Sequence, residues 1–158
     1  MKDKTIKNIR LCCCIALAFC VVWAVYMLYY FFAVILCCST SAHSIDWSVN
    51  TTMRIIILVS YFLGNSAMVV LCIKVILNTF KGLRENTVFP KSNIKLMFWM
   101  ALADFVYLLG FGNLSILWDE NTMFQLQSTN FVSPFFLLFF AFMYKVAADA
   151  VEENNLTV

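Results

Sequence analysis

The sequence predicts an all-α integral membrane protein, with residues 1–158 forming one bundle of four transmembrane helices. Two observations predict this fold, an apolar composition and four long apolar runs. Hydrophobic residues make up 63% of the chain and charged residues 13%, against roughly 45–50% and about 25% in soluble domains. A soluble domain of 158 residues exposes too much surface to hide so many apolar side chains. The composition excludes a disordered chain, a nucleic-acid-binding domain and a secreted disulfide scaffold.

Each of the four runs is long enough to cross a bilayer core, which takes about 20 helical residues. The first exceeds the roughly 7–15 apolar residues of a signal peptide, so we expect an uncleaved anchor. Pro134 is expected in the first turn of the fourth helix, with Ser133 as its cap. Gly82 is expected to end the second helix. The spans are predicted at about 11–38, 55–77, 94–117 and 131–148.

The basic residues predict that both termini lie in the cytoplasm. Ten of the eleven Lys and Arg residues fall in the N-terminal tail, in the loop between the second and third spans, or beside the C-terminal tail. Only Arg54 falls on the other side. Short loops rich in Lys and Arg stay in the cytoplasm. Trp47 and Trp118 are expected at the outer boundary, where membrane proteins are enriched in Trp.

Asp104 is the one acidic residue inside the predicted apolar runs. A central Asp raises the free energy of insertion by about 2.5–3.5 kcal/mol, so we expect it to have a polar partner. Asp104 lies nine residues from Lys95, and Asn65 lies equally far from Lys74. Both are therefore about 13 Å from the cytoplasmic boundary. We expect Asn65 and Ser66 to donate hydrogen bonds to Asp104, as a buried polar clamp or as a proton- or cation-coupled site.

Seven cysteines invite a redox interpretation that their spacing does not support. A quinone-linked thiol oxidoreductase with four helices needs an outer CxxC and a second outer pair. Here Cys37 and Cys38 are adjacent, and the second outer loop has no cysteine. We therefore expect structural cysteines. The single histidine, His43, has only Asp46 as a nearby acid, so no metal is expected. We also expect no cofactor and no enzymatic activity, because the sequence contains no catalytic constellation.

The loop between the second and third spans and the C-terminal tail carry a pattern of their own. Phe89 is followed four residues later by Asn93, at the start of the third span. The tail is acidic, and residues 152–158 are Glu-Glu-Asn-Asn-Leu-Thr-Val. In these features, and in length and span order, the chain resembles the bacterial domain-of-unknown-function family 2975, a family of small four-span membrane proteins. The matching residues are Phe89, Asn93, Glu152, Glu153, Asn154, Leu156, Thr157 and Val158.

The resemblance implies a bacterial inner-membrane location and a regulatory role. The family has no established activity, and its genes commonly neighbour small helix-turn-helix regulators. The resemblance therefore implies a cytoplasmic regulator as the partner, with no direct binding of nucleic acid by this chain. The chain departs from the family pattern at Pro90, where Ser or Thr is usual, and it lacks the Leu-Arg that commonly precedes the tail.

Two functions are expected from these features. The first is a non-enzymatic regulatory or sensory membrane protein that acts through the cytoplasmic loop 81–95 and the acidic tail. The second is a small ion-coupled transporter or permease that uses Asp104 and works as a homo-oligomer, because four helices leave little room for a pathway. For the tail, the alternatives are a frayed end and docking of Glu152 and Glu153 on a basic side chain of the loop. The candidates for that side chain are Lys81, Arg84 and Lys91.

Overall fold

The computed structural model describes residues 3–35, 47, 50–85, 87, 89–118 and 123–156. These residues form four α-helices, and the predicted all-α fold of four apolar helices is confirmed. Each helix is long and apolar enough to cross a membrane. The helices are α1 (Asp3–Ile35), α2 (Thr51–Arg84), α3 (Ser92–Phe111) and α4 (Thr129–Leu156), and a short 3-10 helix, η1 (Leu114–Leu117), follows α3.

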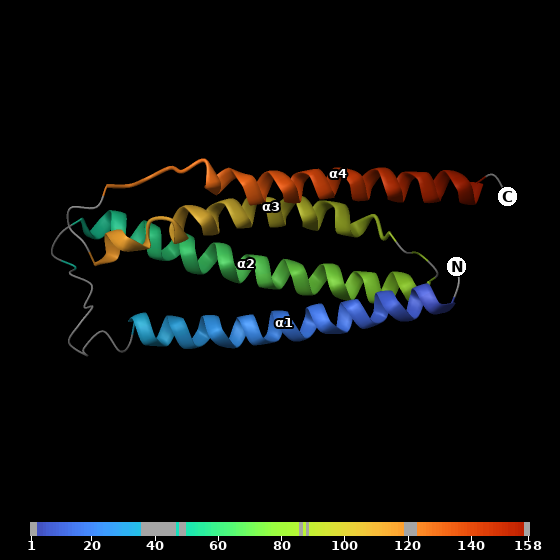
Figure 1. Ribbon diagram of the computed structural model, residues 1–158, viewed down its shortest axis with the longest axis horizontal. Helices are drawn as coiled ribbons and strands as arrows, with labels where there is room; N and C mark the ends of the chain where they lie inside the picture. Colours follow the sequence, from blue (N-terminus) through green and yellow to red (C-terminus); the bar gives the residue numbers. More distant parts are fainter. Residues whose placement is uncertain are drawn as a thin grey trace.

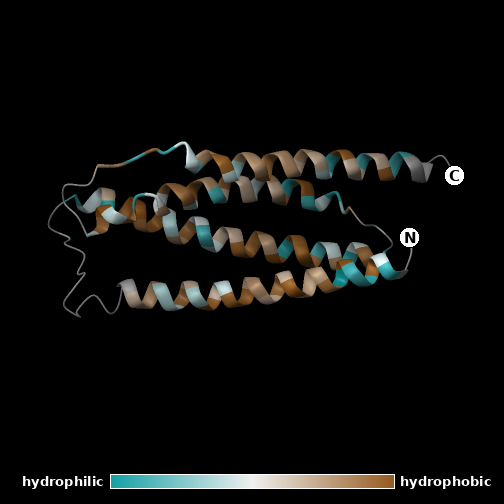
Figure 2. Cartoon of the chain, in the orientation of Figure 1, coloured by the Kyte–Doolittle hydropathy of each residue, from teal (hydrophilic) through white to brown (hydrophobic). Residues whose placement is uncertain are grey.

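The four helices lie side by side in chain order, as Figure 1 shows. α2 and α3 share the largest contact, α1 packs on α2, and α4 packs on α3. Both termini lie at the same end of this row (Figure 1), which we call the terminal end. Figure 2 shows hydrophobic residues along the middle of the helices, with hydrophilic residues in the first turns of α1 and the last turns of α4. The middle of the row is therefore the part suited to hydrocarbon.

Two glycines bring α2 and α3 into close contact. A β-carbon on Gly64 of α2 would lie 2.4 Å from the backbone nitrogen of Tyr107. A β-carbon on Gly110 of α3 would lie 2.4 Å from the backbone nitrogen of Tyr61. In each helix the glycine follows its tyrosine by three residues, so the two antiparallel helices present the same Tyr-x-x-Gly segment to each other. Small residues at such positions let helix backbones approach closely in a membrane.

The third helix ends earlier than the predicted span of 94–117. The α-helix stops at Phe111, and residues 114–117 form η1 instead. Asn113 lies at the break, where its Nδ2 donates to the carbonyls of Leu109 and Gln125, both at 2.9 Å. Its Oδ1 accepts from the backbone N–H of Gln125 at 2.7 Å. Asn113 therefore satisfies backbone groups of the extended segment 123–127, as irregular backbone at this depth requires.

Arg54 holds η1 against the start of α2. It lies in the first turn of α2 and is 1% exposed, and its Nε donates to the carbonyl of Ile116 at 3.1 Å. Lys74 follows twenty residues later on the same helix, which corresponds to about 30 Å. This length equals the thickness of a bilayer core. The two cations therefore mark the expected boundaries of the span.

Two expected helix boundaries are wrong. α4 begins at Thr129, so Pro134 is inside the helix rather than in its first turn, and Ser133 is not the cap. Because Pro134 is only the sixth residue of α4, its missing N–H removes a single bond, to the carbonyl of Asn130. α2 continues past Gly82 to Arg84. Gly82 is required by a close approach instead, since a β-carbon there would lie 2.6 Å from Cγ of Pro90.

Candidate functional site

Asn65 does not bind Asp104, and the predicted hydrogen bonds from Asn65 and Ser66 to Asp104 are wrong. The Oδ1 of Asn65 accepts from Nε1 of Trp23 in α1 at 2.7 Å, and its Nδ2 contacts the sulfur of Met27. Asn65 is buried by α1, being 3% exposed. Ser66 is exposed and lines a groove between α1 and α2. The polar residues of α2 therefore serve the contact with α1.

The error lies in the helix face. Gly64 lies against the carbonyl of Ala103 and the backbone of Tyr107, so it faces this turn of α3. Asn65 follows Gly64 in α2, and Asp104 follows Ala103 in α3, so both polar residues are next to this contact. One residue along a helix is a rotation of 100°. The two polar side chains are therefore turned away from the contact that brings their helices together.

Asp104 is buried without the predicted partner. It is 7% exposed, and its Oδ2 has no hydrogen-bond partner among the described residues. An unpaired polar atom inside a membrane span is energetically unfavourable and frequently marks a functional residue. Asp104 is therefore the strongest candidate for chemistry within the membrane-spanning part of the chain.

Three grooves follow the helix contacts, one between each pair of neighbours, and all three are lined mainly by apolar side chains. The groove between α1 and α2 has a volume of about 610 Å³, with Phe31 and Phe62 among its lining residues. Asp104 lines none of these three grooves. Their apolar lining suits lipid chains better than ions. In the part of the chain that the structure describes, no three His, Cys, Asp or Glu side chains gather to hold a metal ion.

At the terminal end, Asn93 connects three helices. Its side chain is fully buried, and its Nδ2 lies 3.1 Å from the hydroxyl of Thr79 in α2 and 3.2 Å from the hydroxyl of Tyr144 in α4. Phe89 packs on the same tyrosine, with ring centroids 5.3 Å apart in an edge-to-face arrangement. The two loop residues of the predicted pattern, Phe89 and Asn93, are thus brought together on α4.

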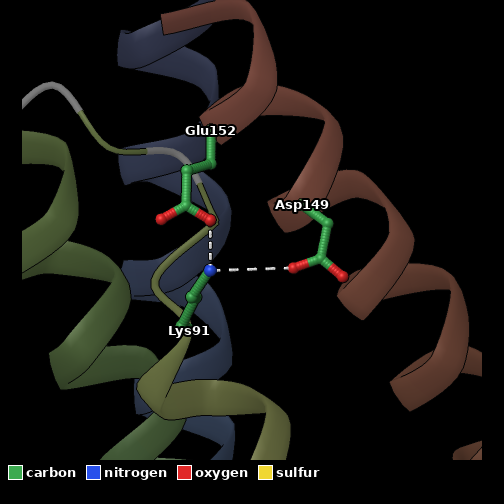
Figure 3. Close-up of polar contacts among 3 residues, drawn as sticks. All are labelled: Lys91, Asp149 and Glu152. Carbon is green, nitrogen blue, oxygen red and sulfur yellow. Dashed lines mark hydrogen bonds and ion pairs between the residues drawn. The ribbon is translucent and has the colours of Figure 1, made fainter. Parts of the chain in front are cut away.

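Lys91 lies between these two residues in the sequence and pairs with the end of α4 (Figure 3). Its Nζ donates a hydrogen bond to Glu152 and lies 3.7 Å from Oδ1 of Asp149. The hydrogen bond to Glu152 and the two negative charges raise the pKa of Lys91 above its ordinary value. One of the pairs considered for the acidic tail, Glu152 with Lys91, is therefore present. Lys81 instead lies 4.0 Å from Glu85 within α2.

The rest of the predicted tail lies at the end of α4. Glu153, Asn154 and Leu156 are within the helix, which ends at Leu156, so the tail continues α4 instead of forming a separate segment. Glu153 is exposed. Thr157 and Val158 lie outside the described residues, as do His43, Cys37 and Cys38. The acidic residues of the tail are thus held on a helix that is anchored to the loop.

Sequence reasoning missed Tyr144 and Asp149 as partners of the loop. Tyr144 is eight residues before Glu152, which is just over two helical turns, so both side chains lie close to one face of α4. Treating the tail as an extension of the fourth helix could have found this face. Instead, the predicted span ended at residue 148, in front of Asp149.

Comparisons with protein-family models, with curated proteins and with solved structures find no match. The resemblance to the family of four-span membrane proteins therefore stays a prediction.

Proposed function

We propose that this chain is a non-enzymatic membrane protein that binds a cytoplasmic protein at its terminal end. The observation that carries the proposal is the bridge from Lys91 to Asp149 and Glu152, because it joins the loop to α4 as one surface. Phe89 and Asn93 also contact Tyr144, so they too hold the loop on α4. A surface already ordered by such contacts loses little entropy when a partner binds.

The partner that the resemblance implies is a small helix-turn-helix regulator, and we propose this class of protein. The cytoplasmic location rests on the positive-inside rule, since ten of eleven basic residues fall in the N-terminal tail, in the loop between α2 and α3, or beside the C-terminal tail in the sequence. In a bacterium this proposal places the chain in the inner membrane. The basic loop and the acidic last turns of α4 would present both signs of charge to the partner, which favours specificity over nonspecific adhesion.

Site-specific photocrosslinking in intact cells tests this function. A photoreactive amino acid at exposed Glu85 is expected to give a covalent adduct with a helix-turn-helix protein, and one at exposed Met123 is expected to give none. The adduct should disappear when residues 149–158 are removed and should persist in Asp104→Asn. Adducts that do not depend on residues 149–158 would contradict the proposal. Labelling of Glu85→Cys from outside the cell would contradict the orientation.

A second function, an ion-coupled transporter, is favoured by one observation, the buried Oδ2 of Asp104, which has no hydrogen-bond partner in the described part of the chain. Buried carboxylates in membrane helices are typical of proton and cation pathways. A test in proteoliposomes compares ion-driven uptake by the wild type with uptake by Asp104→Asn, which keeps the size and removes the charge. Uptake that requires Asp104 would favour the transporter, whereas loss of crosslinking at residue 85 alone would favour the regulatory protein.

A further inference from the structure

The terminal end has a basic edge and an acidic edge. The first two turns of α1 carry three exposed basic residues, Lys4, Lys7 and Arg10. The last turns of α4 carry Asp149, Glu152 and Glu153. Since α1 and α4 are the outer helices of the row (Figure 1), opposite charges lie at the two outer edges of the terminal end.

The hydrogen bond between Tyr144 and Asn93 shows the position of Tyr144 along the helix axes, which we call its level. The Nδ2 of Asn93 also contacts the carbonyl of Val75 and the hydroxyl of Thr79, so Tyr144 is level with residues 75–79 of α2. Glu152 lies eight residues beyond Tyr144 toward the terminal end, and Asp149 lies five residues beyond it. These separations correspond to about 12 Å and about 8 Å along a helix.

The same level can be found on α1. Asn65 of α2 contacts the sulfur of Met27 in α1, and the two helices are antiparallel. Twelve residues further toward the terminal end, the middle of residues 75–79 is opposite Ile15. Lys7 lies eight residues beyond Ile15, and Arg10 lies five residues beyond it. The basic residues of α1 are therefore at the same two depths, about 12 Å and about 8 Å, as the acidic residues of α4.

We propose that the protein assembles with further copies of itself, α1 of one copy packing beside α4 of the next. The equal depths let Lys7 and Arg10 of one copy face the acidic residues of its neighbour without any shift along the membrane normal. Such a contact joins two different surfaces, so repeating it closes a ring or continues as a row. The occupant of each edge is thus a second copy of this chain.

The charges are the specific part of this contact. The outward faces of α1 and α4 are apolar, with Phe19 of α1 71% exposed and Phe135 of α4 65% exposed. Lipid tails are as apolar as these side chains, so the apolar faces permit packing without driving it. Anionic lipid headgroups would account for the basic edge alone. They do not bind the acidic edge, where Asp149 and Glu152 remain 47% and 56% exposed beside Lys91 and can accept a cation from a second copy.

The test uses the purified full chain in nanodiscs of phosphatidylcholine, which contain no anionic lipid and no cytoplasmic protein. Native mass spectrometry is expected to show oligomers of the wild type, and Glu152→Lys/Glu153→Lys should reduce them at least threefold. Adding Lys4→Glu/Lys7→Glu to the same chain should restore them. Two controls should keep the oligomers. Glu85→Lys changes a charge away from the edges, and Lys91→Gln breaks only the bridge within one copy.

A wild-type protein that is monomeric under these conditions overturns the proposal. Oligomers that survive the reversal of Glu152 and Glu153 overturn it as well, and so does a charge swap that fails to restore them while the variant remains folded by circular dichroism. Because the assay contains no cytoplasmic partner, its result is independent of the proposed regulatory function.

Discussion

The backbone of Tyr107 occupies the space that a side chain on Gly64 would need. The nitrogen of Tyr107 is 2.4 Å from the position of a β-carbon on Gly64, and its Cα is 2.7 Å away. The reciprocal contact between Gly110 and Tyr61 has nearly the same distances, 2.4 Å and 2.8 Å. The two tyrosine rings also pack together, with centroids 5.6 Å apart. This pair of contacts fixes how α2 and α3 cross, and it positions the other helices.

Gly64→Ala and Gly110→Ala are each expected to lower the free energy of unfolding by about 1–3 kcal/mol. The added methyl group overlaps backbone atoms, which cannot move without shifting a helix, as in other overpacked cores. Thermal unfolding in detergent, followed by circular dichroism, measures the loss. Ser66→Ala is the matched control, because Ser66 is an exposed neighbour on the same helix. Equal melting temperatures for Gly64→Ala and Ser66→Ala would contradict the close contact.

The hydrogen bond from Trp23 to Asn65 joins α1 to α2. Asn65→Leu leaves the indole N–H without an acceptor and is expected to destabilise α1 docking by about 0.6–1.7 kcal/mol, the range for hydrogen bonds between membrane helices. Trp23→Phe removes the same bond while keeping an aromatic ring. The double variant should therefore be less destabilised than the sum of the two single variants.

Oxidative crosslinking between Cys20 and Cys72 provides the readout for that docking, in a chain whose other cysteines are replaced by alanine. The two cysteines are near each other on facing turns of α1 and α2, so copper phenanthroline should join them efficiently in the wild-type background. Asn65→Leu should reduce the crosslinked fraction. Crosslinking that is unaffected by Asn65→Leu and by Trp23→Phe would show that this hydrogen bond does not hold α1.

The sequence predicts the distance of a polar residue along its helix, whereas it does not predict its helix face. Counting from Lys74 and Lys95 predicts equal depths for Asn65 and Asp104, because the rise of a helix is constant. The rotation of a helix is instead set by which residues approach closely, here Gly64 and Gly110. These glycines do not stand out in an apolar run, where hydrophobic residues surround the whole helix and the periodicity of an amphipathic helix is absent.

The loop shows the complementary case. Phe89 and Asn93, the two residues of the sequence pattern in this loop, both contact Tyr144 of α4. The role of Lys91 was one of three possibilities, and only the extension of α4 to Leu156 decides between them. The helix runs beyond the apolar span because Asp149 and Glu152 gain a cationic partner there. The hydropathy of the sequence alone does not reveal such a partner.

Asn93→Ala is expected to destabilise the terminal end by about 1–3 kcal/mol. The side chain is fully buried, and its removal takes a hydrogen-bond donor from the hydroxyls of Thr79 in α2 and Tyr144 in α4. Tyr144→Phe keeps the ring against Phe89 and removes only one hydroxyl, so its effect should be smaller. Hydrogen exchange of α4 amides in micelles measures both. If Tyr144→Phe exposes these amides as much as Asn93→Ala does, the connection of three helices through Asn93 is not the main constraint.

The bridge at Lys91 is expected to respond to alkaline pH. Its pKa is raised above 10.5 in the folded protein, chiefly by the hydrogen bond to Glu152. A raised pKa means that the folded state binds the proton more tightly, so the bridge stabilises the protein fully below the ordinary pKa of lysine. This contribution is lost as pH rises through the raised pKa. The electron paramagnetic resonance spectrum of a spin label at Ala150→Cys, in a chain without other cysteines, should show the end of α4 becoming mobile as pH rises through this raised pKa, above the ordinary pKa of lysine. Lys91→Gln should be mobile at every pH, and Lys91→Arg should stay ordered, because arginine keeps its charge in this range. The same transition in Lys91→Arg would assign the mobility to another group.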